Sequence, residues 1–316
     1  MFFPRTCVPV EIKRAYSMMI PEPLKKGDTI GILAPASPFD PIRLEQGVSL
    51  ISAMGFKTAI PKELYGSNGY LSAPDAIRAD HIHRYFSNKN IKAIVCARGG
   101  YGSIRILSLL DYDLIGKNPK IFMGFSDITL LLAAFYSKCG LVTFHGPMVA
   151  TLPSSDPVSR ESFFNSLTSS SPLEMSLAEG VVICHGKAMG PLMGGNLTNL
   201  CHLMGTPFQP DSRGHILFLE DRGEALYRID RMLTHLRLAG FLNGIRGLIL
   251  GAFEGCGDYE AIMGLADEMC GGGEIPIFAG LGSGHGKRNL TLPMGLPAVL
   301  DTENGSLMFQ HGLNRK

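Results

Sequence analysis

The chain has 316 residues, of which 45% are hydrophobic and 18% are charged, and its formal net charge is +1. This composition suffices for large cores, and the length fits two domains better than one. A near-neutral charge gives no electrostatic basis for a nucleic-acid or membrane-surface partner, and no apolar run reaches the roughly 18 residues of a membrane-spanning helix. Neither a nucleic-acid-binding protein nor a membrane protein is therefore expected.

Seven cysteines are scattered along the chain without a Cys-x-x-Cys pair, and some, such as Cys96 and Cys184, lie in apolar runs. A thiol in such a run packs as a small hydrophobic side chain, which argues against a zinc cluster. Residues 1–20 lack an apolar core followed by a cleavage site, so no signal peptide is expected. We predict a cytoplasmic protein in which residues 1–20 form an extension and Met18 or Met19 is an alternative start.

Strand and helix patterns alternate along the first half of the chain. This order favours a parallel sheet with helices on both faces, in which functional residues collect at the carboxyl ends of the strands. The first α/β domain is predicted to cover residues 21–152. Strands are expected within 28–37 and at 57–60, 91–97, 121–125 and 141–144, and helices at 41–54, 72–85, 103–110 and 127–136.

The pattern changes after the first domain. Residues 153–180 are rich in turn signals and weakly periodic, which predicts a linker. A second α/β domain is predicted at 181–316. Its strands are expected at 181–184, 215–220, 248–253 and 275–279 and its helices at 197–204, 225–238 and 258–269, with a glycine loop at 190–195 and a hairpin of 298–300 with 306–309.

One serine lies between a predicted strand and a predicted helix. Ser126 follows the apolar run 121–125, and a Leu/Ala-rich helical pattern begins directly after it. A strand that turns sharply into a helix exposes such a hydroxyl beside free backbone N–H groups, as in serine hydrolases. The pattern Gly124-Phe-Ser-Asp-Ile lacks the second glycine of Gly-x-Ser-x-Gly. Alternatively, Ser126 only caps the helix N-terminus.

Three further groups follow predicted strands. The loop Arg98-Gly-Gly-Tyr-Gly102 could point backbone N–H groups at an anion, or it could simply turn the chain into the next helix. Glu220 and Asp221 point to opposite faces of their strand, so only one can enter a shared site; alternatively, both acids favour the dipole of the next helix. His285 lies among glycines, without the apolar neighbours of a core histidine. A serine, a carboxylate and a histidine can supply a nucleophile, an orienting group and a base.

Six motifs, which occur along the chain in the same order as in a known family, carry a resemblance to that family. From about Lys26 to its C-terminus, the chain is similar to the L,D-carboxypeptidase family of serine peptidases, which includes murein tetrapeptide and microcin C immunity peptidases. The motifs are Gly124-Phe-Ser-Asp-Ile-Thr, Arg98-Gly-Gly-Tyr-Gly, Gly194-Gly-Asn-Leu-Thr, Phe218-Leu-Glu-Asp-Arg-Gly-Glu, Tyr227-Arg-Ile-Asp-Arg and Gly282-Ser-Gly-His-Gly.

The resemblance implies a fold and a catalytic triad. It implies a flavodoxin-like N-terminal domain that carries the nucleophile Ser126. A C-terminal α/β domain would carry Glu220 and His285, and the active site would lie in the cleft between the domains. Members of the family need no metal or other cofactor and are commonly homodimers.

The resemblance also implies an oxyanion hole formed by the backbone N–H groups of Asp127 and of a glycine in the loop 98–102. Gly100 is the first choice and Gly99 the alternative. Substrate binding is assigned to Arg98, Gly99, Tyr101 and Arg222, and the two arginines follow strand ends where they could bind a terminal carboxylate.

The expected function is that of a serine-type L,D-carboxypeptidase in cell-wall recycling. It would hydrolyse the amide bond to the terminal D-Ala of murein tetrapeptide through an acyl-enzyme. One alternative is an immunity peptidase for a peptidyl-nucleotide of the microcin C type, against which the absence of Trp counts weakly. An alternative from another class is a non-catalytic module that binds an anion or a nucleotide.

Overall fold

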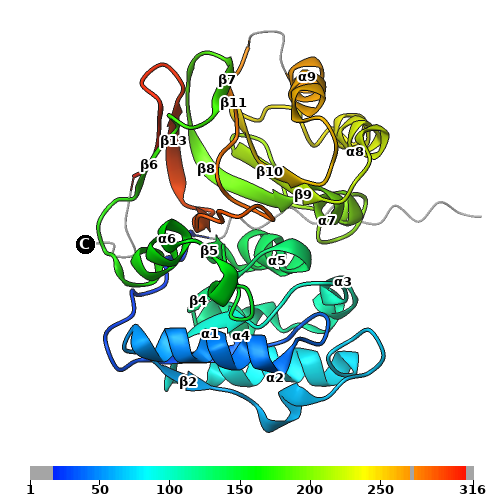
Figure 1. The fold of residues 1–316 in the computed structure, drawn as a ribbon. Helices are drawn as coiled ribbons and strands as arrows, with labels where there is room; N and C mark the ends of the chain where they lie inside the picture. Colours follow the sequence, from blue (N-terminus) through cyan, green and yellow to red (C-terminus); the bar gives the residue numbers. More distant parts are fainter. Residues whose placement is uncertain (1–16, 271–273, 311–316) are drawn as a thin grey trace, which may run out of the picture.

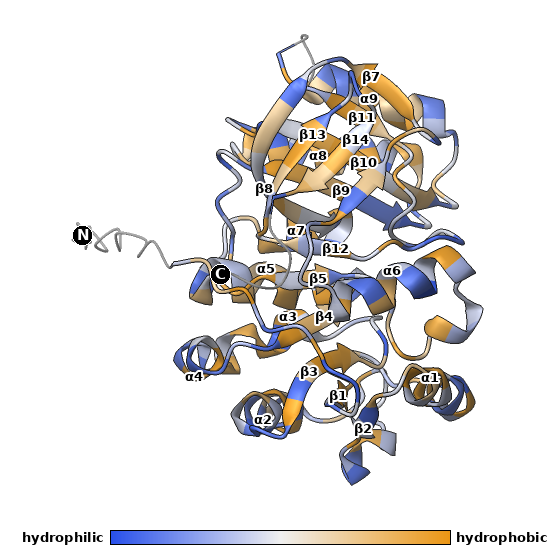
Figure 2. Ribbon diagram, turned by 90° about the vertical axis from the view of Figure 1, so that its left-hand side faces the viewer, coloured by the Kyte–Doolittle hydropathy of each residue, from blue (hydrophilic) through white to orange (hydrophobic). Residues whose placement is uncertain are grey.

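The computed structural model describes residues 17–270 and 274–310, which form two α/β halves lying one above the other (Figure 1). The predicted extension at residues 1–20 falls mostly outside the described residues. Figure 2 shows hydrophobic residues concentrated on the strands, with hydrophilic residues mainly on the peripheral helices and loops. No helix in the described part of the chain is both long and apolar enough to cross a membrane.

The N-terminal half is built on a six-stranded sheet with the order β12-β5-β4-β3-β1-β2. Strands β1 to β5 pair in parallel in the flavodoxin-like order 2-1-3-4-5, which confirms the predicted fold class. The elements are β1 (Thr29–Leu33), α1 (Pro41–Ala53), β2 (Lys57–Ala59), α2 (Asp75–Ser87), β3 (Ile91–Cys96), α3 (Ser103–Ile106), α4 (Tyr112–Lys117), β4 (Ile121–Gly124), the 3-10 turn η3 (Ser126–Ile128), α5 (Thr129–Cys139), β5 (Thr143–His145) and α6 (Pro157–Thr168).

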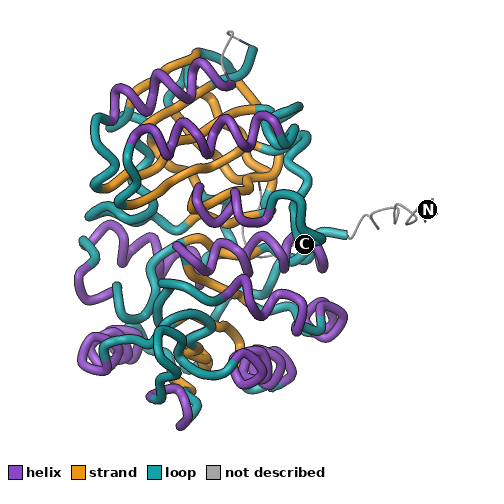
Figure 3. Tube along the Cα trace, turned by 90° about the vertical axis from the view of Figure 1, so that its right-hand side faces the viewer, coloured by secondary structure: helices purple, strands orange, loops and turns teal. Residues whose placement is uncertain are grey.

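The C-terminal half is built on an eight-stranded mixed sheet with the order β6-β14-β13-β8-β9-β10-β11-β7. Helices α7 to α9 pack against one face of its parallel strands β8 to β11, and Figure 3 shows them outside the strands. The elements are β6 (Glu174–Ser176), β7 (Val181–Cys184), β8 (Lys187–Asn196), α7 (Leu197–Leu203), β9 (Ile216–Arg222), α8 (Leu226–Leu238), β10 (Gly247–Glu254), α9 (Tyr259–Cys270), β11 (Ile277–Ala279), β12 (Leu292–Met294), β13 (Pro297–Asp301) and β14 (Ser306–Phe309).

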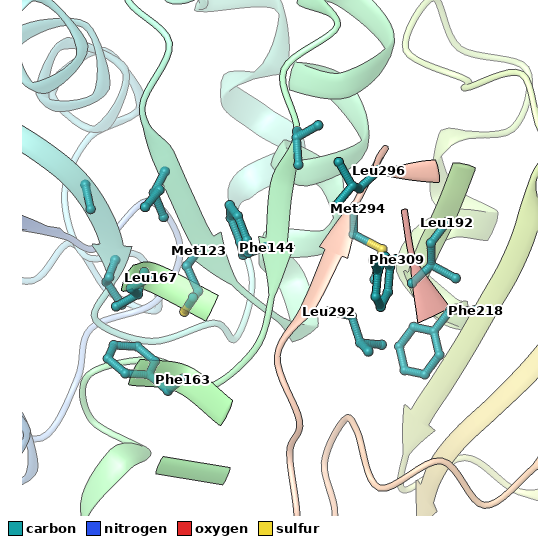
Figure 4. Packing of buried hydrophobic residues seen from close by; sticks show 14 of the residues in the cluster. Met123, Phe144, Phe163, Leu167, Leu192, Phe218, Leu292, Met294, Leu296 and Phe309 are labelled. Atoms are coloured by element: carbon teal, nitrogen blue, oxygen red, sulfur yellow. The ribbon is translucent and has the colours of Figure 1, made fainter. Parts of the chain in front are cut away.

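The two halves share a sheet edge and an apolar core. β12 comes from the segment assigned by sequence to the C-terminal domain, yet it pairs antiparallel with β5 of the N-terminal sheet. Figure 4 shows Met123 and Phe144 of the first sheet and Phe218 of the second in one buried cluster, with Leu292 between them. Because both sheets contribute to this cluster, the two halves are packed together on the side of the first sheet where β5 pairs with β12.

Two predictions about irregular segments were wrong. The predicted linker contains α6 and β6, since Asp156 caps α6 by accepting from the Ser159 N–H and Pro157 occupies its first turn. The predicted glycine loop at 190–195 lies inside β8. A Cβ at Gly194 would lie 1.9 Å from the Phe218 carbonyl oxygen, so glycine is required there for close strand packing rather than for a turn.

Candidate active site

Ser126 lies at a sharp turn between β4 and the helical segment formed by η3 and α5. Among the described residues it is the one non-glycine residue with a positive φ, 63°. This left-handed conformation costs an L-residue roughly 1–2 kcal/mol and is typical of functional sites. The capping residue of η3 is Phe125, so the alternative in which Ser126 only caps the helix is wrong. A Cβ at Gly124 would lie 2.7 Å from the Ile128 side chain, so the turn requires glycine there.

Glu220 and His285 form a buried hydrogen-bonded pair in the C-terminal half. Glu220 Oε2 accepts from His285 Nδ1 at 2.6 Å and from the His285 backbone N–H at 3.1 Å. The Glu220 side chain is 0% exposed and the His285 side chain 13%. Because an ionised carboxylate can only accept, Nδ1 carries the proton and Nε2 remains free to act as a base.

Strand alternation separates the two neighbouring acids of β9. Asp221 points away from His285, and its carboxylate accepts from Asn196 Nδ2 at 2.8 Å and from Thr198 Oγ1 at 2.7 Å. The loop that carries His285 approaches Glu220 so closely that a Cβ at Gly284 would lie 2.6 Å from Oε2. Glycine at that position therefore permits the Glu220–His285 hydrogen bond.

Phe125 brings the elbow of the N-terminal half against the histidine of the C-terminal half. The rings of Phe125 and His285 meet edge to face with their centroids 4.9 Å apart, and Phe125 directly precedes Ser126. The structure records no hydrogen bond between Ser126 and His285 within the described residues. Catalytic hydrogen bonds are often long in ligand-free sites.

The loop 98–102 packs directly against Ser126. A Cβ at Gly99 would lie 3.0 Å from the Ser126 Cβ and 3.2 Å from its Oγ. Gly100 has a φ of +108°, and within the described residues no acceptor is recorded for its N–H. The same loop also begins a helix, because Gly102 is the capping position of α3. Both predicted readings of the loop are therefore compatible with its geometry.

Asp127 connects the elbow to α3. Its side chain is 1% exposed, and its Oδ2 accepts from the Ser103 N–H at 2.8 Å. Burial raises the pKa of Asp127, although the hydrogen bonds from Ser103 oppose that shift. The Asp127 N–H lies in the first helical turn, where backbone N–H groups lack intrahelical acceptors.

Three of the predicted substrate-binding residues, Arg98, Tyr101 and Arg222, are exposed. Arg98 is exposed and its Nη1 donates to the Pro38 carbonyl at 2.9 Å. Tyr101 is 47% exposed, and its ring lies 5.7 Å from that of Tyr70. Arg222 is exposed at the end of β9, and among the described residues it makes no recorded contact with Ser126 or with the loop 98–102. Substrate binding by these residues stays a prediction.

The sequence reasoning missed several supporting residues. Ser37 Oγ accepts from the Tyr101 N–H at 3.1 Å, and Asn289 Oδ1 accepts from the Gly284 N–H at 2.9 Å. Arg78 is fully buried beside the loop 98–102. Its spacing from Ile82 and Phe86 is the one signal that could have revealed it, because it places the arginine on the apolar face of α2.

His145 is buried at the end of β5, between Phe125 and Phe218. Neither of its ring nitrogens has a hydrogen-bond partner in the described part of the chain. Burial, and secondarily the nearby His285, lower the pKa of His145 to about 3. The imidazole is therefore neutral at ordinary pH.

Two observations concern other kinds of site. A cavity of about 410 Å³ is lined by residues of α6, the segment 173–180 and the segment 278–290, but not by Ser126, Glu220 or His285. No group of three His, Cys, Asp or Glu residues that could hold a metal ion occurs among residues 17–270 and 274–310.

Comparison with known proteins identifies the family. Residues 30–146 match the LD-carboxypeptidase N-terminal domain, and residues 189–300 match the LD-carboxypeptidase C-terminal domain. The chain is 37% identical over 306 residues to a probable murein peptide carboxypeptidase of Bacillus subtilis (strain 168), covering 93% of this chain and 95% of that protein. It is 30% identical over 326 residues to the Escherichia coli microcin C7 self-immunity protein MccF, covering 92% and 95%.

Solved structures agree with this assignment. An MccF-like protein from Bacillus anthracis str. Ames superimposes with a TM-score of 0.87 at 29% identity, covering 93% of this chain and 99% of that one. A non-catalytic binding module is therefore not supported, because both halves of the chain match domains of peptidases. The chain belongs to the LD-carboxypeptidase family and is a hydrolase of the serine carboxypeptidase type.

Proposed function

We propose that the protein hydrolyses the amide bond to the terminal D-Ala of murein tetrapeptide through a Ser126-His285-Glu220 triad. The observation that carries the proposal is the Glu220–His285 pair, which the Phe125 contact brings against the strained Ser126 elbow. The similarity to a probable murein peptide carboxypeptidase supports the choice of substrate.

The proposed chemistry follows from the proton positions at the pair. His285 Nε2 takes the proton of the Ser126 hydroxyl as Oγ attacks the scissile carbonyl, and Glu220 stabilises the imidazolium that forms. His285 then protonates the leaving amine of D-Ala. A water molecule hydrolyses the acyl-enzyme, again with His285 as the base.

The negative oxygen of the tetrahedral intermediate would be held by the backbone N–H groups of Gly100 and Asp127. Asp127 directly follows Ser126 in the first turn of η3, and Gly100 directly follows Gly99, whose Cβ would lie 3.0 Å from the Ser126 Cβ. Removing one oxyanion donor typically costs about 10²–10³ in rate. We assign Arg98, Gly99, Tyr101 and Arg222 to substrate binding, with the two guanidinium groups available for the terminal carboxylate.

The test is incubation of the purified protein with murein tetrapeptide and quantification of free D-Ala. Wild-type protein should release D-Ala. Ser126→Ala should release none while keeping the circular dichroism spectrum of the wild type. If Ser126→Ala keeps wild-type turnover, this serine is not the nucleophile and the proposed mechanism is wrong.

A second candidate substrate is a peptidyl-nucleotide of the microcin C type, favoured by the similarity to MccF. The exposed Tyr70 and Tyr101 rings could stack on a nucleobase, as Trp would in other proteins. Hydrolysis of processed microcin C without hydrolysis of murein tetrapeptide would reverse the order of the two candidates. A cytoplasmic location and a homodimer are part of the proposal, to be checked by fractionation and by light scattering.

A further inference from the structure

Arg78 is a buried arginine behind the loop that borders Ser126. Its side chain is 0% exposed, although arginine is almost never fully buried unless its donors are paired. The reaction proposed above assigns it no role, since it touches neither Ser126 nor His285 in the recorded contacts.

The guanidinium joins three separate stretches of backbone. Nη1 donates to the Gly102 carbonyl at 2.9 Å and also to the Pro35 carbonyl, which follows β1. Nε donates to the Ala73 carbonyl at 3.1 Å, and Nη2 pairs with Asp75 at 2.5 Å. One planar group thus holds the loop after β1 and the loop after β3 to the start of α2.

The contact with Gly102 acts on the loop 98–102 at its C-terminal end. Gly102 has a φ of +130°, and a Cβ there would lie 3.1 Å from Arg78 Nη1. The next residue, Ser103, donates its N–H to Asp127, which directly follows Ser126. At the other side of the loop, Ser37 Oγ accepts from the Tyr101 N–H. The loop backbone around Gly100 is therefore held between Arg78, Ser37 and Asp127.

From these contacts we propose that Arg78 is a positioning residue, which holds the Gly100 N–H in the place where the oxyanion develops; this inference rests on the proposed function. Without the guanidinium, the Pro35 and Ala73 carbonyls lose the donor that Arg78 supplies, the Gly102 carbonyl keeps only the Arg105 N–H at 3.2 Å, and the loop can shift. A misplacement of about 1 Å at a catalytic group can cost roughly 10²-fold in rate.

The experiment compares Arg78→Ala and Arg78→Lys with the matched control Arg84→Ala. Arg84 lies on the same helix, but its ion pair with Asp80 is exposed, with 52% and 54% of the side chains accessible. The readouts are kcat and KM for D-Ala release, the rate of Ser126 labelling by a serine-directed phosphonate, and the thermal unfolding temperature.

We expect Arg78→Ala to lower kcat by about 10²-fold while KM changes by less than about threefold, because the oxyanion donor acts mainly in the transition state. Millimolar guanidinium chloride, but not sodium chloride, should restore part of the lost kcat by filling the vacated site. Arg78→Lys keeps the charge but not the planar set of donors, so an intermediate loss is expected. Arg84→Ala should behave as wild type.

A purely structural role would lower the unfolding temperature while the folded variants kept wild-type kcat and labelling rate, and that result would overturn the inference. If Arg78→Ala does not fold, Arg78→Lys decides in the same way: full kcat overturns the inference and a reduced kcat supports it. If wild-type protein neither releases D-Ala nor is labelled at Ser126, the proposed function fails and this inference fails with it. Wild-type activity with unaffected Arg78 variants overturns the inference alone.

Discussion

Replacing Glu220 by glutamine tests how the carboxylate acts on His285. The substitution keeps the size of the side chain and removes its charge. Glu220 Oε2 accepts from both Nδ1 and the backbone N–H of His285, whereas Oε1 has no partner among the described residues. The backbone N–H can only donate, so the amide of Gln should turn its oxygen toward His285 and keep Nδ1 protonated.

This geometry sets the expected magnitude. Because the tautomer is kept, the loss should not exceed the contribution of one hydrogen bond to a charged group, about 1.5–3 kcal/mol, or roughly 10–150-fold in kcat. A reversed tautomer would cost about 10⁴-fold. The amide NH₂ at the former Oε1 position would be buried without a partner, which should lower the free energy of unfolding by about 1–3 kcal/mol.

The assay is D-Ala release under saturating substrate, together with urea unfolding. The matched control is Asp221→Asn, which changes the neighbouring acid on the opposite face of β9, where it bonds Asn196 and Thr198 rather than His285. This control should lose stability and keep kcat within a few-fold in the folded protein. A Glu220→Gln kcat within threefold of wild type would refute stabilisation of the His285 imidazolium by the charge of Glu220, and a loss near 10⁴ would refute the argument from the backbone N–H.

Three other predictions concern stability. Ser126→Gly should be about 1 kcal/mol more stable to urea than Ser126→Ala, since φ is 63° there, and equal stabilities would argue against strain at the elbow. Gly194→Ala should lower the free energy of unfolding by about 4 kcal/mol or more, or prevent folding, because the new Cβ would meet a backbone oxygen. Gly264→Ala, in open space on α9, should raise it by about 1 kcal/mol. Thermal unfolding checks both variants. In the unfolded chain His145 binds a proton below its ordinary pKa of 6.5, whereas in the folded protein its pKa is about 3. Between these two pKa values unfolding takes up a proton, so the free energy of unfolding falls as the pH falls. Replacing His145 by Phe should therefore make the unfolding free energy less steep in pH by up to about 1.4 kcal/mol per unit below pH 6, and an unchanged slope would contradict the neutral burial of this ring.

The sequence was most informative where local periodicity and chain order decide the outcome. The apolar runs ending at Ala97 and Phe125 predicted parallel strands, and these strands pair as β3 and β4. The predicted hairpin of 298–300 with 306–309 is confirmed by the pairing of β13 with β14. These features depend on residues that are near one another in the chain, so the pattern carries the necessary information.

The sequence was misleading where distant segments determine local structure. Glycines at 190–195 indicated a loop, yet they form part of β8 because its neighbour β9 approaches too closely for a side chain. Residues 292–294 belong by chain order to the second half, but the edge of the first sheet offers them unpaired backbone groups. Neither neighbour is visible from the local sequence.

The sequence by itself determined the alternating α/β pattern, the elbow at Ser126 and the opposite directions of Glu220 and Asp221. Only the tertiary structure decided which of these two acids meets His285, since that depends on where the loop after β11 crosses β9. It also decided that Arg78 lies buried behind the loop 98–102. Hydrogen bonds between residues 24 to 65 positions apart come from the packing of whole elements, which the spacing of residues within one element does not specify.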